Sequence, residues 1–173
     1  MINHHSIAVN APVERIFEQL LIWGESKWWP AGCPMRYTRL TDGEIGVGTR
    51  YRQKVERPLG PEWEVEVVSV TRGREVSRRF IKGMFTGVER LYIIREKTGS
   101  EVHYMMDFEV PGAKDRFLWN TFYKARHDEN VAMVLAALKR YLEGSGKPEE
   151  VEEHPSTAEC AARREFLRSF IKR

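Results

Sequence analysis

Residues 62–67 read EWEVEV, and this hexapeptide carries the clearest period-two signal in the chain. Its apolar members, Trp63, Val65 and Val67, alternate with Glu62, Glu64 and Glu66. A period of two places alternate side chains on opposite faces of a β-strand. The hexapeptide therefore predicts a strand with one face toward a core and the other toward water.

The surrounding residues, 35–110, continue this kind of pattern. Short alternating runs are separated by turn residues such as Thr41-Asp42-Gly43 and Arg72-Gly73-Arg74. Residues 88–96 and 102–110 indicate a hairpin. Strands that follow one another this directly pair in an antiparallel sheet. With a short strand at residues 5–9, we expect about seven strands.

Helical periodicity appears on both sides of this meander. Apolar residues recur at helical spacing from Val13 to Leu20, and residues 27–32 are predicted as a second short helix or a turn. Residues 114–142 carry a longer apolar pattern that ends near Gly144. We therefore expect an α+β fold in which a curved antiparallel sheet wraps a long C-terminal helix, with two short helices after the first strand.

Length and composition exclude several classes of protein. The chain has 173 residues, which suits one domain, and a net charge of +3, which is too small to indicate nucleic-acid binding. Two cysteines, Cys33 and Cys160, cannot form a disulfide framework or the usual zinc site. No segment is apolar enough to span a bilayer. The sequence predicts a cytoplasmic protein with no metal, no cofactor and no stable membrane insertion.

The opening SIAVNAPVERIFEQLLIW, residues 6–23, resembles the first strand and helix of the START-related (SRPBCC) superfamily. Residues 46–52, GVGTRYR, are similar to its glycine-rich strand entry, and the helix that ends at Leu142 resembles its long C-terminal helix. The likeness covers roughly residues 3–143. It implies the helix-grip fold and the group labelled polyketide cyclase/dehydrase or lipid-transport proteins, although a fold does not determine function.

Aromatic side chains provide most of the candidate ligand site. They fall on faces expected to point between sheet and helix, where a packed core explains them as well as a cavity does; the resemblance favours a cavity. The predicted cavity residues are Tyr51, Trp63, Phe80, Arg90, Tyr92, Tyr104, Phe108, Trp119, Phe122 and Val134.

Whether Arg90 faces the interior depends on the register of its strand, which the pattern leaves open. Arg90 shares its phase with Val88, Tyr92 and Ile94, but the opposite phase also contains apolar residues. An inward guanidinium would need a partner and could bind a ligand oxyanion. An outward one would be an ordinary surface arginine, and Arg78 raises the same question.

Three functions follow from these features. The first is binding of a hydrophobic or aromatic small molecule, lipid-like or polyketide-like, in the cavity. The second is a cyclase or dehydratase in the same cavity, with Arg90, Tyr92, Tyr104 and His127 as the candidate catalytic residues. The third is partner binding through residues 144–173, an acidic linker and a helical extension appended to the domain of residues 1–143. This extension is expected to pack on the domain or on a second chain in a homodimer.

Overall fold

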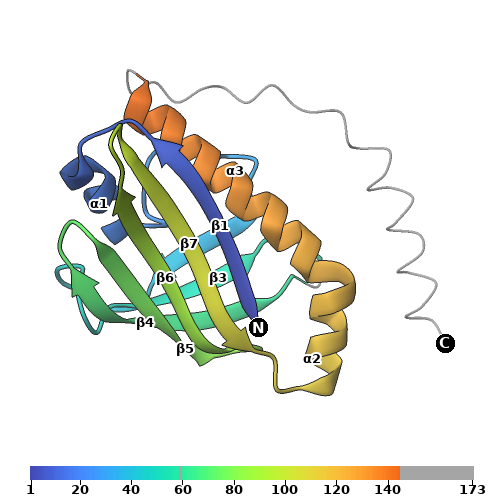
Figure 1. The fold of residues 1–173 in the computed structure, drawn as a ribbon. Coiled ribbons are helices and arrows are strands. Elements are labelled where there is room, and N and C mark those ends of the chain that lie inside the picture. The colour runs from blue at the N-terminus through green and yellow to red at the C-terminus, as the bar shows by residue number, and fades with distance from the viewer. Residues whose placement is uncertain (59, 145–173) are drawn as a thin grey trace.

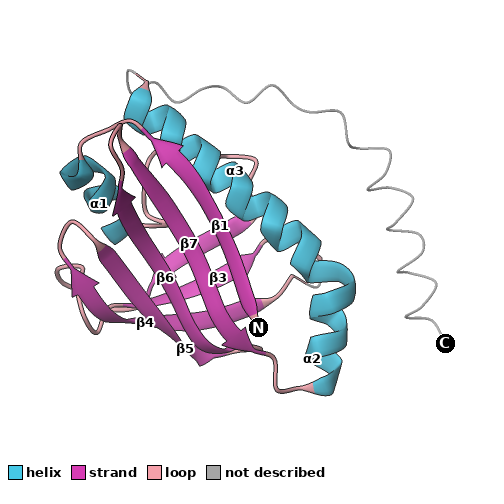
Figure 2. Ribbon diagram, viewed as in Figure 1, coloured by secondary structure: helices cyan, strands magenta, loops and turns pink. Residues whose placement is uncertain are grey.

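A computed structural model describes residues 1–58 and 60–144, which form a seven-stranded antiparallel sheet and a long C-terminal helix (Figures 1 and 2). The strand order across the sheet is β1-β7-β6-β5-β4-β3-β2. The expected fold class is confirmed. The strands are β1 (Ile2–Val9), β2 (Met35–Arg39), β3 (Arg50–Val55), β4 (Glu62–Thr71), β5 (Glu75–Lys82), β6 (Thr86–Arg95) and β7 (Ser100–Glu109).

One short helix, α1 (Val13–Leu21), follows the first strand and buries Ile16, Phe17 and Leu20. The expected second short helix is absent from the described residues that follow α1. Residues 22–34 instead form hydrogen-bonded turns, in which the Trp29 amide donates to the Ser26 carbonyl at 3.1 Å. Pro30 and Gly32 explain this result, because both residues disfavour the interior of a helix.

The C-terminal helical region has three parts. It begins with α2 (Ala113–Leu118), widens into a π-helical turn, η1 (Trp119–Tyr123), and continues as α3 (Lys124–Glu143). Figure 1 shows α3 running along the sheet beside β1. The contacts agree, since β1 is the strand that α3 touches most. The helix ends where the sequence predicts, next to Gly144.

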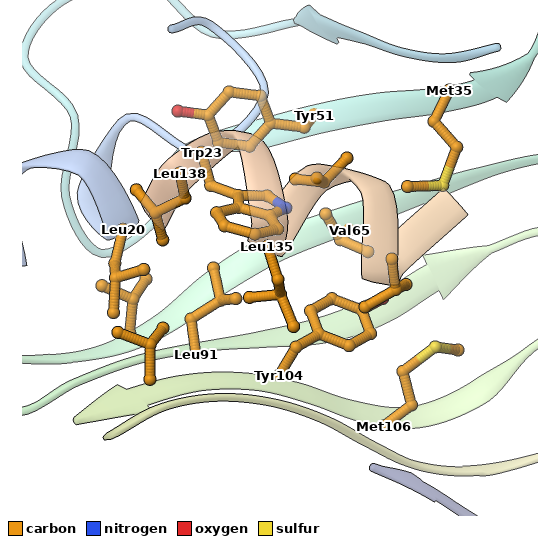
Figure 3. Packing of buried hydrophobic residues seen from close by; sticks show 14 of the residues in the cluster. Leu20, Trp23, Met35, Tyr51, Val65, Leu91, Tyr104, Met106, Leu135 and Leu138 are labelled. Atoms are coloured by element: carbon orange, nitrogen blue, oxygen red, sulfur yellow. The ribbon is translucent and has the colours of Figure 1, made fainter. Parts of the chain in front are cut away.

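Buried side chains of the curled sheet and of the helices pack against one another between the two layers (Figure 3). Val65, Leu91 and Met106 come from three different strands, and Leu135 and Leu138 come from α3. Burying one such side chain contributes about 1.5–3 kcal/mol. The alternation in EWEVEV is confirmed here, because Trp63, Val65 and Val67 all lie in the core.

The expected extension falls outside the described residues, except for Gly144 at the end of α3. Within the part of the chain that is described, no helix has the length and apolar character needed to cross a membrane. In the same part, His, Cys, Asp and Glu side chains do not gather into any group of three that could hold a metal ion.

Candidate functional site

An ion pair lies inside the core between strands β5 and β6. Arg78 and Glu89 are directly opposite each other in the antiparallel register, on the inner face of the sheet. Arg78 Nη1 is 3.2 Å from Glu89 Oε1, and the side chains are 0% and 1% exposed. Burial of a charge is costly unless it is paired, so each residue depends on the other.

Tyr104 is the second partner of Glu89. Its hydroxyl donates a hydrogen bond to Glu89 Oε2 at 3.0 Å. Burial, together with the negative charge of Glu89, raises the pKa of Tyr104 well above its usual value. Tyr104 therefore stays a neutral hydrogen-bond donor, and the two Glu89 oxygens receive one donor each from Arg78 and Tyr104.

Two further tyrosines surround this pair. The Arg78 guanidinium lies over the ring of Tyr51, with Cζ 5.2 Å from the ring centroid, a cation–π contact. Burial raises the pKa of Tyr51 to about 12. Burial and then the charge of Glu89 raise the pKa of Tyr37 well above its usual range. We call Tyr37, Tyr51, Arg78, Glu89 and Tyr104 the interior polar cluster.

Arg78 also carries hydrogen-bond donors that its ion pair does not use. Its Nε and Nη2 atoms are buried and have no hydrogen-bond partner among the described residues. Gln53 lies on β3, two residues from Tyr51. Its Nε2 and Oε1 atoms are likewise buried and have no hydrogen-bond partner among the described residues. A buried polar group without a partner costs about 1–3 kcal/mol. These atoms therefore favour a bound molecule that supplies hydrogen-bonding groups inside the core.

An aromatic cluster adjoins the α2 end of the core. Phe85 is its centre, with its ring edge-on to the rings of Trp63, Phe108 and Trp119 at centroid distances of 5.2, 5.3 and 5.0 Å. Phe80 is tilted against Phe85 at 5.4 Å. These rings bury one another, so each predicted aromatic here has packing contacts that need no ligand.

The structure places most of the predicted cavity residues on the inner side of the sheet or on the helical region that covers it. The buried ones are Tyr51, Trp63, Phe80, Tyr104, Phe108, Trp119 and Val134. His127, a predicted catalytic candidate, is also buried. Of these, Tyr51 and Tyr104 belong to the interior polar cluster. Contact of any of these residues with a ligand stays a prediction.

Arg90 and Tyr92 lie elsewhere, which corrects their prediction as cavity residues and decides the register that the pattern left open for Arg90. Glu89 and Leu91 are the residues of β6 that face the interior. Arg90 lies between them in the sequence and is therefore exposed on the outer face. Its Nε is 3.9 Å from Glu75 Oε1. Tyr92 stacks on the His103 ring of β7 at 4.6 Å on the same outer face. Neither residue lines the space between the sheet and α3.

Phe122 is the third correction, because 39% of it is exposed. The prediction assumed α-helical spacing, in which Trp119 and Phe122 would share a face. The π-helical turn bonds residue i to residue i+5 and is wider, so residues three apart turn away from each other. Trp119 is buried, while Phe122 contacts the exposed Phe117 ring at 6.3 Å.

A shallow groove of about 410 Å³ lies on the outer face of the sheet, lined by Arg74, Glu75, Arg90, Tyr92, Ile93, Ile94 and Met105. Arg90 and Tyr92, which were predicted to line the interior cavity, line this outer groove. Arg74 and Arg90 are exposed and Glu75 is partly exposed, and Arg90 and Glu75 lie close enough to pair with each other. The outer groove therefore lacks the buried, unpaired donors that distinguish the interior.

His127 is a buried histidine on α3, between the rings of Tyr104 and Trp119 at 5.9 and 5.5 Å. Burial lowers its pKa to about 4, so it is neutral at pH 7. Its ordinary pKa is about 6.5. Protons therefore bind the unfolded chain more readily than the folded one between these two values, and stability is lost as the pH falls through this window.

We expect His127 to account for roughly 2.5 kcal/mol of lost stability between pH 7 and pH 4.5. Urea unfolding at both pH values should show this loss in the wild type. The variant His127→Gln, which cannot titrate, should lose less by about that amount. Equal losses in the two proteins would contradict the burial of a neutral His127.

The sequence reasoning missed Glu89, Gln53, Tyr37 and Phe85 as members of the site. A signal existed for two charged residues: Arg78 lies between Val76 and Phe80, and Glu89 shares the phase of Leu91 and Ile93. A charged residue among the apolar residues of one strand face indicates either that the register was assigned wrongly or that the charge is buried in an ion pair. The second reading is correct here.

Solved structures superpose on most of this chain. The chain shares their fold, in which a curved antiparallel sheet wraps a long C-terminal helix. KanY matches with a TM-score of 0.65 and 17% identity, and the match covers 83% of this chain and 98% of that chain. The Aha1 dimer from Colwellia psychrerythraea matches with a TM-score of 0.57 and 19% identity, covering 85% and 98%.

A third solved structure, Ara h 8.0201, has a TM-score of 0.62 and 10% identity, with coverage of 84% of this chain and 99% of that chain. At these identities the likeness shows the fold alone. No protein-family model matches the sequence, and no curated protein matches it.

Proposed function

We propose that the protein binds a hydrophobic or aromatic small molecule between the sheet and α3, with its polar end at the interior polar cluster. The observation that carries this proposal is the pair of donors on the fully buried Arg78, Nε and Nη2, that have no hydrogen-bond partner in the described part of the chain. The surrounding core is apolar and aromatic, which suits the body of such a molecule. The helix-grip resemblance supports the same location.

The proposal predicts where a neutral apolar probe binds. Methyl-resolved NMR during titration with N-phenyl-1-naphthylamine should shift the signals of Val65, Leu91 and Leu135, whose side chains are buried between the sheet and α3. The exposed methyls of Ile94, which line the outer groove, are the matched control and should stay unchanged. Shifts confined to Ile94 and its neighbours, or no binding, would refute the proposal.

The enzyme alternative has fewer candidate residues than the sequence suggested. Of the four catalytic candidates, Arg90 and Tyr92 lie on the outer face, while Tyr104 and His127 lie inside. Tyr104 is a neutral donor already bonded to Glu89, and His127 is neutral at pH 7. These features suit binding of a polar group better than proton transfer, so we place ligand binding first.

A further inference from the structure

The interior polar cluster contains one positive and one negative charge. Among the described residues, Arg78 and Glu89 are the only Arg, Lys, Asp or Glu side chains that are buried. The other buried polar groups, such as Gln53 and His127, are neutral. The interior is therefore electrically balanced before any ligand binds.

This charge balance disfavours the binding of a ligand that carries a carboxylate group. An added negative charge at Arg78 would lie close to Glu89 in a region of low dielectric constant, where like charges repel strongly. It would also compete with Glu89 for the single buried guanidinium. The surroundings offer no second buried cation within the described part of the chain.

The unused donors nevertheless call for an acceptor. Nη1 of Arg78 contacts Glu89, while Nε and Nη2, which form the other edge of the planar guanidinium, have no partner among the described residues. An uncharged carbonyl oxygen can accept from this edge without adding charge. Gln53 adds an amide donor and an amide acceptor.

We infer that the site selects uncharged carbonyl compounds, such as ketones, amides or esters on an aromatic or apolar body, over the corresponding carboxylic acids. This inference rests on the proposed function and specifies the class of its ligand. Glu89 is then the residue that determines specificity. It keeps Arg78 paired and prevents the guanidinium from accepting an anion.

Three probes with one aromatic body test the inference at pH 7: naphthalene, 2-acetylnaphthalene and 2-naphthoate. Isothermal titration calorimetry on the wild-type protein should show the ketone binding at least about tenfold more tightly than the carboxylate, because only the carboxylate adds a charge near Glu89. The ketone should also bind more tightly than naphthalene, which has no acceptor.

The variant Glu89→Gln should reverse the preference. It leaves Arg78 as the only buried charge among the described residues, so 2-naphthoate can complete the ion pair and should gain at least about tenfold in affinity. The matched control is Glu66→Gln, a similar change on the outer face of β4, which should leave the preference unchanged. The wild-type comparison decides the question even where Glu89→Gln fails to fold.

The outcomes separate the two claims. Equal binding of all three probes, or tighter binding of the carboxylate by the wild type, would overturn the selection of uncharged ligands while the proposed function stands. Binding of none of the three would overturn the proposed function and the inference together.

Discussion

Replacing Glu89 with leucine is expected to destabilise the protein by about 3–5 kcal/mol, because it leaves the Arg78 charge buried without its partner. Arg78 is completely buried, and its described ion pair is with Glu89 alone. The Tyr104 hydroxyl also loses its acceptor in this variant. Urea unfolding at pH 7, monitored by tryptophan fluorescence, measures the change.

A double variant distinguishes the loss of pairing from the loss of packing. Arg78→Met combined with Glu89→Leu removes both charges and keeps apolar volume, so it should recover most of the lost stability. Glu66→Leu, on the outer face of β4, removes an exposed ion pair with Arg50 and should cost at most about 1 kcal/mol. A double variant no more stable than Glu89→Leu would contradict this account of the pair.

The second large effect is expected at Phe85. Truncation to alanine should cost about 3–5 kcal/mol, since the ring is buried and is shared by the aromatic cluster. Its contacts with Trp63, Phe108 and Trp119 would all be lost at once. Urea unfolding at pH 7 gives the free energy of unfolding of the variant.

Phe117 provides the matched control for Phe85. It is also a phenylalanine, but 63% of it is exposed on α2, so Phe117→Ala should change stability by no more than about 0.5 kcal/mol. Similar losses at the two positions would show that the aromatic cluster does not hold the α2 end of the core together.

Much of the fold follows from local pattern. The alternation in residues 62–67 predicts a strand and also which of its faces is buried, because polar and apolar residues separate cleanly there. The hairpin of residues 88–110 and the helix that ends at Glu143 were predicted for the same reason. The secondary structure of residues 27–32 was harder to predict, since tryptophans beside Pro30 and Gly32 suit a helix end and a turn equally well.

The candidate site needed information that local pattern lacks. In β6 both phases contain apolar side chains, Val88 and Ile94 on one and Leu91 and Ile93 on the other, so alternation could not determine which faces inward. The pairing of β6 with β5 settled this by placing Glu89 opposite Arg78. The exposure of Phe122 could not be predicted from the pattern either. The pattern assumes the hydrogen-bond spacing of a regular α-helix, and the π-helical turn has a different spacing.

The sequence by itself determined the strand meander, the covering helix and the aromatic character of the core, because these depend on the period of apolar residues along the chain. Only the tertiary structure decided that Arg78, Glu89 and Tyr104 meet in the interior while Arg90 and Tyr92 remain outside. The physical reason is that a buried charge is tolerated only beside its partner, and strand register determines which residues become partners.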